Sequence, residues 1–439
     1  MLAQAVRPLV RLVDRYLPDP YIFVLILTLL VMVAAVAIEG RSPMAVIGMW
    51  GNGFWDLLAF SMQMLLVLVT GFMLASTPPV KRVLVAIARS VRSPGAAILT
   101  VSLVSLCAHW INWGFGLIAS ALLAKEVARL VHVDYRLLIA SAYSGFVVWH
   151  GGLSGSVPLS IATPGHPFEA LTGVIGTGQT TFAFFNLAIV AALFVVVPLV
   201  NRLMLPSEAD SVYVDRALLP DAAPEDDNED GKIERPADRL ETSRGVSLLI
   251  GLAGVVWLVV YFVNGGGLML NTVNFLFLTL AILLHGTPRR LLASLREAIK
   301  GGGGIVIQFP FYAGIMGIMV GSGLADTLSK VLLSVASERT LPFLVFISAG
   351  IVNFFVPSGG GQWAVQAPAI LPAAQALGAD MARVAMAVAW GDAWTSLIQP
   401  FWVLPVLAIA GLRAKDIMGY CAMHLLLTGI IISIGLTFL

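Results

Sequence analysis

Long apolar runs separated by short polar segments occupy most of the 439-residue chain. A membrane-crossing helix needs about 20 predominantly apolar residues, and most of these runs approach that length. The pattern therefore predicts an all-α polytopic membrane protein. The expected spans cover residues 21–38, 57–75, 96–111, 114–128, 136–149, 181–200, 246–263, 271–284, a run from the glycines at 301–304 to 323, a run that begins at 341, and 417–438.

Asparagine and glycine interrupt two of these runs. The first interruption reads I-N-W-G-F-G at 111–116, and the second reads V-N-F-F-V-P-S-G-G-G-Q-W at 352–363. Non-helical backbone at membrane depth is tolerated only where it is buried in protein or lines a cavity. Because paired interruptions in corresponding halves point to a transporter's substrate site, we expect re-entrant hairpins or broken helices at both places.

A further pair of interruptions is expected at 150–158, which reads H-G-G-L-S-G-S-V-P, and at 391–400. The two halves of the chain also share an order of features. The interval from Asp134 to Gly145 equals that from Asp380 to Gly391, and a glutamine precedes each Asn/Gly interruption, at Gln63 and Gln308. This shared order predicts an internal structural repeat.

Basic residues, which favour the cytoplasmic side of a membrane, predict that the halves are inverted. The span that contains Gln63 ends at the basic arm that begins with Lys81, whereas the span that contains Gln308 begins after Lys300. With a cytoplasmic N-terminus, the two spans run in opposite directions. Inverted repeats place the substrate near the midplane, at the interface between them.

Three parts of the chain follow from this interpretation. The first membrane half is 1–205, and it opens with an amphipathic helix that carries Arg7, Arg11 and Arg15. Residues 206–245 form an acidic cytoplasmic linker, which is too polar to bury a core of its own. The second membrane half is 246–439.

Composition supports the membrane class. The chain is 58% hydrophobic and 12% charged, about half the charged fraction of a soluble domain. The net charge of +1 gives no indication of a nucleic-acid partner. Cys107 and Cys421 lie in apolar runs, so we expect small buried hydrophobes and no disulfide. The first apolar run is too long for a cleavable signal peptide and lacks a cleavage site.

The interruptions supply candidate substrate-binding groups. Glycines allow the backbone to approach a ligand closely, and free N–H groups at a helix start bind carboxylates without a fixed positive charge. Few charges and many apolar side chains suit a small monocarboxylate with a short alkyl tail. The candidates are Asn112, Trp113, Gly114, Gly116, Gly151, Gly152, Ser154, Ser156, Asn353, Ser358, Gly359, Gly360, Gly361, Gln362 and Trp363. A single intramembrane Asn is more often a helix–helix hydrogen-bonding residue, so the pairing of Asn112 with Asn353 carries this expectation.

Asp392 is the carboxylate expected within the bilayer in the second half. Ionisable residues at that depth are costly and commonly functional, so Asp392 is a candidate for coupling through Na⁺ or H⁺, with Gln308 and Gln63 as further candidates. A helix-capping or interhelical role is the alternative. The histidines have no metal-binding spacing, and we expect no metal and no organic cofactor.

At these residues the chain resembles the AtoE-type short-chain fatty acid transporters of bacteria. The matching stretches are R-Y-L-P-D-P at 15–20, W-G-N-G-F-W-D-L-L-A-F at 50–60, I-N-W-G-F-G-L at 111–117, Q-F-P-F-Y-A-G-I at 308–315, V-P-S-G-G-G-Q-W at 356–363 and Q-P-F-W-V-L-P-V-L-A-I-A-G-L at 399–412. The chain departs from the family pattern at His150, where a third Gly is expected, and at Leu153, where Phe is expected.

The resemblance implies import of acids such as butyrate and acetoacetate across the bacterial inner membrane. It also implies elevator-type alternating access in a homodimer. Two other classes remain open. An intramembrane enzyme acting on acyl groups would need a nucleophile–base pair, such as Ser154 or Ser358 with a nearby His, and no spacing supports one. A channel is disfavoured because no rings of charge are evident. We therefore expect a carrier and not an enzyme.

Overall fold

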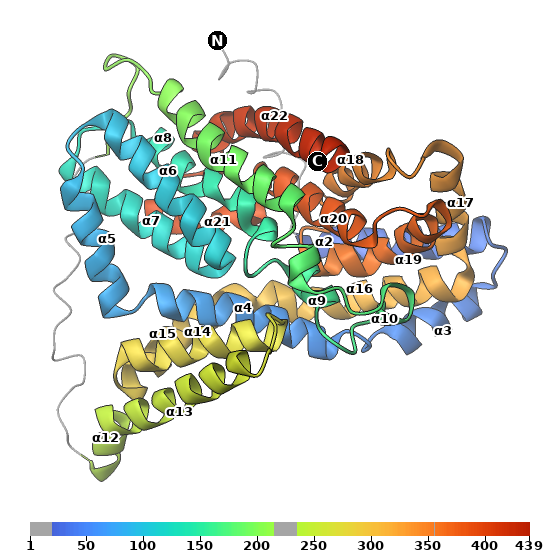
Figure 1. Cartoon of the computed structure of the whole chain (residues 1–439), viewed down its shortest axis with the longest axis horizontal. Helices are drawn as coiled ribbons and strands as arrows, with labels where there is room; N and C mark the ends of the chain where they lie inside the picture. The colour runs from blue at the N-terminus through green and yellow to red at the C-terminus, as the bar shows by residue number, and fades with distance from the viewer. Residues whose placement is uncertain (1–19, 215–234, 355) are drawn as a thin grey trace.

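The computed structural model describes residues 20–214, 235–354 and 356–439, and every regular element in these ranges is a helix. The expected all-α class is confirmed. Figure 1 shows the helices stacked into an elongated body in which α4 runs along the long axis. The expected N-terminal amphipathic helix and the acidic run 225–230 lie outside the described residues.

Twelve elements make up the first part of the chain. They are α2 (Pro20–Ala37), α3 (Pro43–Gly53), α4 (Leu58–Ala75), α5 (Pro78–Ser90), α6 (Pro94–Ile111), α7 (Trp113–Leu130), α8 (Tyr135–Ser144), the 3₁₀ turn η1 (Gly145–Gly151), α9 (Ser156–Ile161), α10 (Glu169–Thr172), η2 (Thr177–Gln179) and α11 (Phe184–Leu203). Proline at the first helical position starts α3, α5 and α6, where its missing N–H removes no hydrogen bond.

The second part begins with a short helix inside the expected linker. Its elements are α12 (Pro236–Glu241), α13 (Arg244–Val263), α14 (Leu270–His285), α15 (Pro288–Ala298), η5 (Ile299–Gly302), α16 (Gly303–Ser322), α17 (Leu324–Val335), α18 (Leu341–Val352), α19 (Gly359–Leu377), α20 (Met381–Ser396), α21 (Pro400–Ala410) and α22 (Ala414–Phe438). Arg289 of α15 donates to Asp238 and Glu241, which ties α12 to the membrane body.

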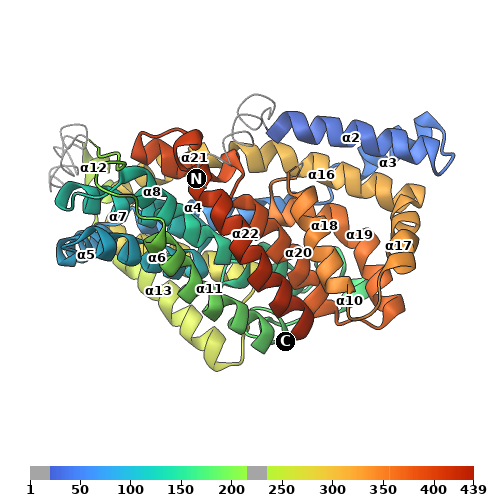
Figure 2. The ribbon, with the colours of Figure 1, turned by 90° about the horizontal axis from the view of Figure 1, so that it is seen from above.

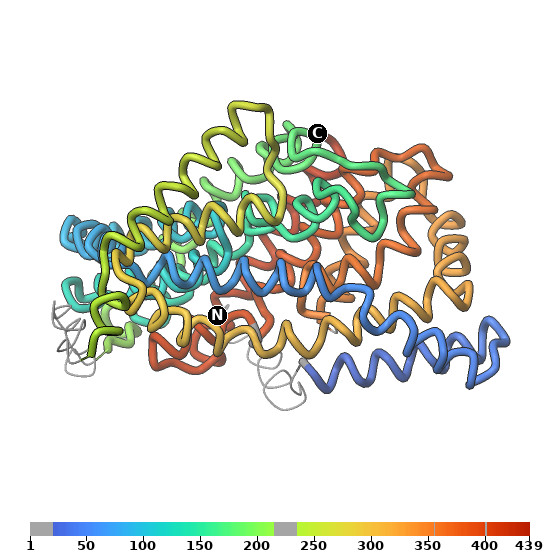
Figure 3. Tube along the Cα trace, turned by 90° about the horizontal axis from the view of Figure 1, so that it is seen from below, coloured from blue at the N-terminus to red at the C-terminus, as the bar shows by residue number. Residues whose placement is uncertain are grey.

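Seven helical segments of the described chain are long and apolar enough to cross a membrane, and α14, α18 and residues 21–37 form shorter apolar helices. The protein is therefore a multi-pass membrane protein. At one end of the body, α2 and α3 pack on α16, and at the other end α14 and α15 lie beside α4, with α13 packed on α14. Figure 2 shows α2 and α3 at the edge of the molecule, beyond α16, and Figure 3 shows α4 passing between the two groups.

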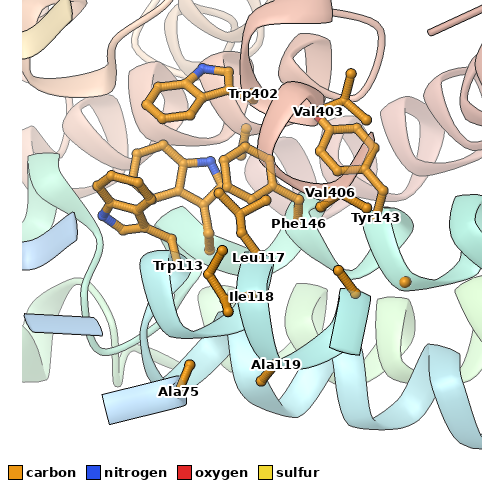
Figure 4. Close-up of a cluster of buried hydrophobic side chains, with 14 of the residues drawn as sticks. Ala75, Trp113, Leu117, Ile118, Ala119, Tyr143, Phe146, Trp402, Val403 and Val406 are labelled. Atoms are coloured by element: carbon orange, nitrogen blue, oxygen red, sulfur yellow. The ribbon is translucent and has the colours of Figure 1, made fainter. Parts of the chain in front are cut away.

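Aromatic side chains fill the centre of the larger hydrophobic cluster (Figure 4). Trp113 of α7 makes edge-to-face contacts with Trp149 and Trp402, at centroid distances of 5.8 and 5.3 Å. Phe146 stacks between Tyr143 and Trp149, at 5.7 and 5.6 Å. This cluster fixes the start of α7 against η1 and α21, so the first interruption has a rigid support.

The helix interruptions are narrower than the sequence predicts. Only Asn112 separates α6 from α7, and 353–358 separate α18 from α19. The segment expected to be broken from 391 is helical up to Ser396, because α20 continues through Gly391 and Asp392; the interruption covers 397–399. A Cβ on Gly391 would lie 2.5 Å from the carbonyl oxygen of Phe346, so this glycine permits close packing of α20 on α18 and does not break the helix.

The matched aspartates cap corresponding helices, and the matched glycines lie at equal distances after them, Gly145 at the end of α8 and Gly391 inside α20. Asp134 caps α8 by accepting from Leu137 N–H, and Asp380 caps α20 by accepting from Ala382 and Arg383 N–H. Gly145 abuts Ser105 on α6 as Gly391 abuts α18. In both halves, therefore, the matched aspartate caps a helix and the matched glycine allows a close contact with a neighbouring helix.

Candidate functional site at the helix interruptions

Asn112 forms the first interruption. Its backbone is extended, its Oδ1 accepts from Phe115 N–H at 2.9 Å, and this bond caps α7. The side chain is fully buried, and its Nδ2 has no hydrogen-bond partner among the described residues. Gly71 of α4 leaves the room for it, since a Cβ there would lie 2.2 Å from Oδ1. The interruption therefore presents a free amide donor beside a helix N-terminus.

The other candidates of the first interruption lie in the first turn of α7. A Cβ on Gly114 would come within 2.9 Å of the Leu68 carbonyl oxygen on α4, and one on Gly116 within 2.5 Å of the His109 ring. These glycines therefore serve close helix packing. The main-chain N–H of Trp113 donates to Ser154 Oγ at 3.0 Å, which joins α7 to the Gly/Ser segment at 150–156.

Asn353 begins the second interruption, and its amide holds the C-terminal part of α20. Nδ2 lies 2.9 Å from both the Asp392 carbonyl oxygen and Thr395 Oγ1, and 3.1 Å from Ser396 Oγ. The main-chain oxygen of Asn353 accepts from Gln399 Nε2. Asn353 Oδ1 is buried without a partner among the described residues. This asparagine thus links two interruptions and leaves one acceptor free.

Ser358 caps α19, and the three glycines after it contact three different elements. Its Oγ accepts from Gly361 N–H at 3.4 Å. A Cβ on Gly359 would lie 2.2 Å from His150 Nε2, one on Gly360 2.6 Å from the Phe60 ring, and one on Gly361 2.4 Å from the Tyr312 ring. The start of α19 is therefore enclosed by η1, α4 and α16.

The segment at 150–156 lies between the two Asn/Gly interruptions. Ser154 contacts the first through Trp113, and His150 and Ser156 abut Gly359 of the second. His150 Nε2 and Ser156 Oγ are 2.9 Å apart. The structure thereby brings together candidate residues from three separate stretches of sequence.

Gly151 and Gly152 occupy crowded positions in the same segment. A Cβ on Gly151 would lie 2.5 Å from the Trp390 ring, and one on Gly152 2.1 Å from the Trp110 carbonyl oxygen. Asn186 of α11 connects this segment to α20, because its Nδ2 donates to the Gly151 carbonyl at 3.0 Å and its Oδ1 accepts from Trp390 Nε1 at 3.0 Å. Sequence reasoning missed Asn186; its signal is a single amide near the start of an apolar span.

Asp392 lies in the middle of this buried polar region. Its side chain is fully buried, and neither carboxylate oxygen has a hydrogen-bond partner among the described residues. Its Oδ1 lies 4.0 Å from His150 Nε2, and the imidazole is also fully buried. An isolated ionised carboxylate in such surroundings is strongly unfavourable, so this site demands a proton or a compensating charge.

Gln362 and Trp363 complete the first turn of α19. Gln362 Nε2 donates to the Ala349 carbonyl and to Gln366 Oε1, both at 2.8 Å, and its own Oε1 is buried with no partner among the described residues. The Trp363 ring packs edge-to-face on Phe168, at 5.6 Å. Gln362 therefore adds an acceptor, and Trp363 an apolar wall that meets the segment after α9.

The two candidate glutamines lie in different surroundings. Gln308 Oε1 accepts from Tyr312 Oη at 3.2 Å, which places it one side chain away from Gly361. Gln63 Nε2 instead donates to Asn271 Oδ1 at 2.9 Å, and the main-chain carbonyl of Gln63 accepts from Asn274 Nδ2. Gln63 thus joins α4 to α14 and makes no recorded contact with the residues at the interruptions.

The described side chains include no group of three or more His, Cys, Asp or Glu residues arranged to hold a metal ion. The buried polar atoms without a partner among the described residues include Asn112 Nδ2, Asn353 Oδ1, Gln362 Oε1, His150 Nδ1 and both carboxyl oxygens of Asp392. The helices α7 and α19 each start with a side-chain cap at the Asn/Gly interruptions. Helix N-termini attract anions through their free N–H groups and their dipole. Such groups can bind a small anion without an arginine or lysine.

Comparisons with known proteins identify the relatives of this chain. The family model described as short chain fatty acid transporter matches residues 1–439. An Escherichia coli (strain K12) protein named "Putative short-chain fatty acid transporter" is 46% identical over the full length of both chains. A Haemophilus influenzae protein of the same name is 41% identical, again over both full lengths. The crystal structure of the Alcanivorax borkumensis YdaH transporter superposes with a TM-score of 0.59 at 16% identity, over 95% of this chain and 98% of that one, a likeness that concerns the fold alone.

Proposed function

Because this chain belongs to the short-chain fatty acid transporter family, we propose that it is a secondary active carrier of small monocarboxylates of the butyrate and acetoacetate class across the bacterial inner membrane. One observation carries the proposal. The 150–156 segment contacts the capped start of α7 through Ser154 and the start of α19 through His150 and Ser156. A carboxylate held there would meet helix N-termini on both sides.

The substrate's two ends would meet different surroundings. Asn112 Nδ2 and the hydroxyl of Ser358 offer donors to the carboxylate. Phe60 and Tyr312, which flank Gly360 and Gly361, offer apolar surface to a short alkyl tail. The surroundings hold few fixed charges, which favours a monocarboxylate over a dicarboxylate.

Alternating access would move the interruption-bearing helices past α4 and α16. The helix α4 contacts both Asn/Gly interruptions, and α16 contacts the second. Glycines lie at these contacts: Gly71 and Gly114 between α4 and α7, Gly360 against α4 and Gly361 against α16. Smooth contacts of this kind suit an elevator movement. We include in the proposal a cytoplasmic N-terminus and inversion of the two halves, which the distribution of basic residues supports. A homodimer is also part of the proposal and rests on the family resemblance alone.

One observation could favour an intramembrane acyl hydrolase as the alternative: His150 Nε2 lies 2.9 Å from Ser156 Oγ. In a hydrolytic triad the carboxylate holds the other ring nitrogen. Here Asp392 faces the same Nε2, at 4.0 Å, so it does not orient the ring toward the serine. The geometry favours binding over nucleophilic catalysis.

Counterflow exchange tests the proposed function. Proteoliposomes preloaded with unlabelled butyrate should take up external radiolabelled butyrate transiently above equilibrium, at a pH well above the pKa of the acid so that passive permeation is small. Protein-free liposomes are the control, and acetoacetate should compete while succinate should not. Uptake equal to that of the protein-free liposomes would refute the proposal, and release of acid from butyrate esters would support the hydrolase.

A further inference from the structure

We propose that His150 and Asp392 act together as a proton-holding pair that takes up one proton with each bound monocarboxylate. This inference rests on the proposed function, because it identifies the coupling ion at that same site. It also assigns a role to His150, which lies one residue before the glycines of the 150–156 segment.

Both partners are fully buried, and their side chains face each other. His150 Nε2 and Asp392 Oδ1 lie 4.0 Å apart, and neither oxygen of Asp392 has a hydrogen-bond partner among the described residues. Ser156 Oγ, at 2.9 Å, holds the same imidazole nitrogen. The carboxyl can therefore exchange a proton with the imidazole after a small movement of either side chain, or through one molecule that bridges the two groups.

Few other chargeable groups lie on the elements that pack around the pair. On α6, which packs on η1, the buried His109 has its Nδ1 2.8 Å from the Ser105 carbonyl oxygen. The helices α9, α18 and α19, which pack on α20, contain no acidic, basic or histidine residue. On α22, Cys421 is a buried thiol and His424 Nε2 faces Asn201 Oδ1. Tyr143 and Tyr312 approach Asp392 from α8 and α16, but their hydroxyls donate to the Ser396 carbonyl and to Gln308 Oε1. Charge balance must therefore come from the pair itself and its ligands.

The number of protons taken up with each anion follows from this charge balance. The empty pair carries one proton, either on His150 beside an ionised Asp392 or on Asp392 beside a neutral His150, and is neutral in both cases. A bound carboxylate adds one negative charge. Uptake of one further proton from the same side of the membrane protonates both partners and restores neutrality. One proton then travels with each anion, and both the loaded and the empty carrier cross without net charge.

The local oxygens favour this proton over a sodium ion. The carbonyl of Asp392 and the hydroxyls of Thr395 and Ser396 are already engaged by the amide of Asn353. The remaining close neighbour of the carboxylate is an imidazole nitrogen, whereas hard cations such as Na⁺ prefer oxygen ligands. A proton needs only the two side chains already in place.

Calorimetric titration of butyrate into the purified full-length protein, in sodium-free buffers of different ionisation enthalpy, counts the protons taken up on binding. We expect about one proton per butyrate and an association constant that rises about tenfold for each unit by which the pH falls. His150→Gln should bring the proton count toward zero and flatten the pH dependence, because the remaining carboxyl of Asp392 is already protonated in the empty, neutral site. His132→Gln and Asp56→Asn, which change exposed residues of the same types, should behave as the parent protein.

The outcomes separate this inference from the proposed function. Absence of butyrate binding by the parent protein would defeat the proposed function, and with it this inference. Butyrate binding with no proton uptake, or binding that requires Na⁺, would overturn the proton pair while leaving the carrier intact. Proton uptake that persists in His150→Gln would place the proton elsewhere. Should this variant fail to fold, the proton count and sodium independence of the parent protein still decide between proton and sodium.

Discussion

The main-chain N–H of Trp113 donates to the hydroxyl of Ser154 at 3.0 Å, and this bond joins residues 41 positions apart in the sequence. It is the direct link between the first Asn/Gly interruption and the 150–156 segment. Replacement of Ser154 by Ala leaves that buried N–H without its acceptor, a loss that destabilises a protein by about 1–3 kcal/mol.

We therefore expect Ser154→Ala to lower the apparent melting temperature of the purified protein. Ser334→Ala is the matched control, because Ser334 is exposed on α17 and its hydroxyl donates only within its own helix, to the Val331 carbonyl. Equal melting temperatures for the two variants would show that the link does not support the fold.

Gly360 tests whether close packing at the start of α19 matters for transport. A Cβ at this position would lie 2.6 Å from the Phe60 ring, so Gly360→Leu must displace α4 or the first turn of α19. We expect butyrate counterflow to fall at least about tenfold, equivalent to about 1.4 kcal/mol, in protein that still elutes as a single species. Gly303→Ala, which meets no atom within 4 Å, should transport as the parent does. Normal counterflow in Gly360→Leu would remove this surface from the site.

Asp392→Asn keeps the shape of the side chain and removes its charge. If Asp392 couples transport to an ion gradient, gradient-driven accumulation of butyrate should fall while counterflow exchange persists, because exchange needs no net ion movement. The measurement is the ratio of accumulation to counterflow in the same proteoliposome preparation. An unchanged ratio would make Asp392 a structural residue and direct the search for the coupling site to Gln308 and Asn353.

The distribution of basic residues predicts which side of the membrane each end of the helices faces. In a background with Cys107 and Cys421 replaced by Ala, cysteines at Arg82 and Glu225 should react with a membrane-impermeant thiol reagent from the cytoplasmic side. A cysteine at the exposed Asn264, beyond the opposite end of α13, should react from the other side. Labelling of Arg82→Cys and Glu225→Cys from opposite sides would refute the proposed inversion.

Much of the fold is readable from the sequence, because apolar runs and the Asn/Gly interruptions have strong local signals. The widths of the interruptions are not readable. Gly391 resembles a helix breaker, yet it serves the close packing of α20 on α18. From the sequence alone, a glycine that lets a neighbouring helix pack closely cannot be distinguished from a glycine that ends its own helix.

The candidate site was partly predictable for the same reason. Asn112, Asn353 and Ser358 are helix caps with local sequence signals. Gln63 was expected near the coupling site, but it faces amides of α14, since mid-span position does not reveal which neighbour a side chain meets. The links made by Asn186 and Gln399 depend on residues distant in sequence, and no local pattern reports such contacts.

The central claim is that the start of α19 binds the substrate carboxylate, and equilibrium binding of radiolabelled butyrate to purified Ser358→Ala tests it most directly. Loss of one buried hydrogen bond to a charged group amounts to about 1.5–3 kcal/mol, so the account predicts binding weaker by roughly 10- to 100-fold. Loss of the helix cap lowers stability as well, so Ser358→Thr, which keeps a hydroxyl, should restore much of the affinity, and Ser334→Ala should bind as the parent does. Parental affinity in a folded Ser358→Ala protein would contradict the account.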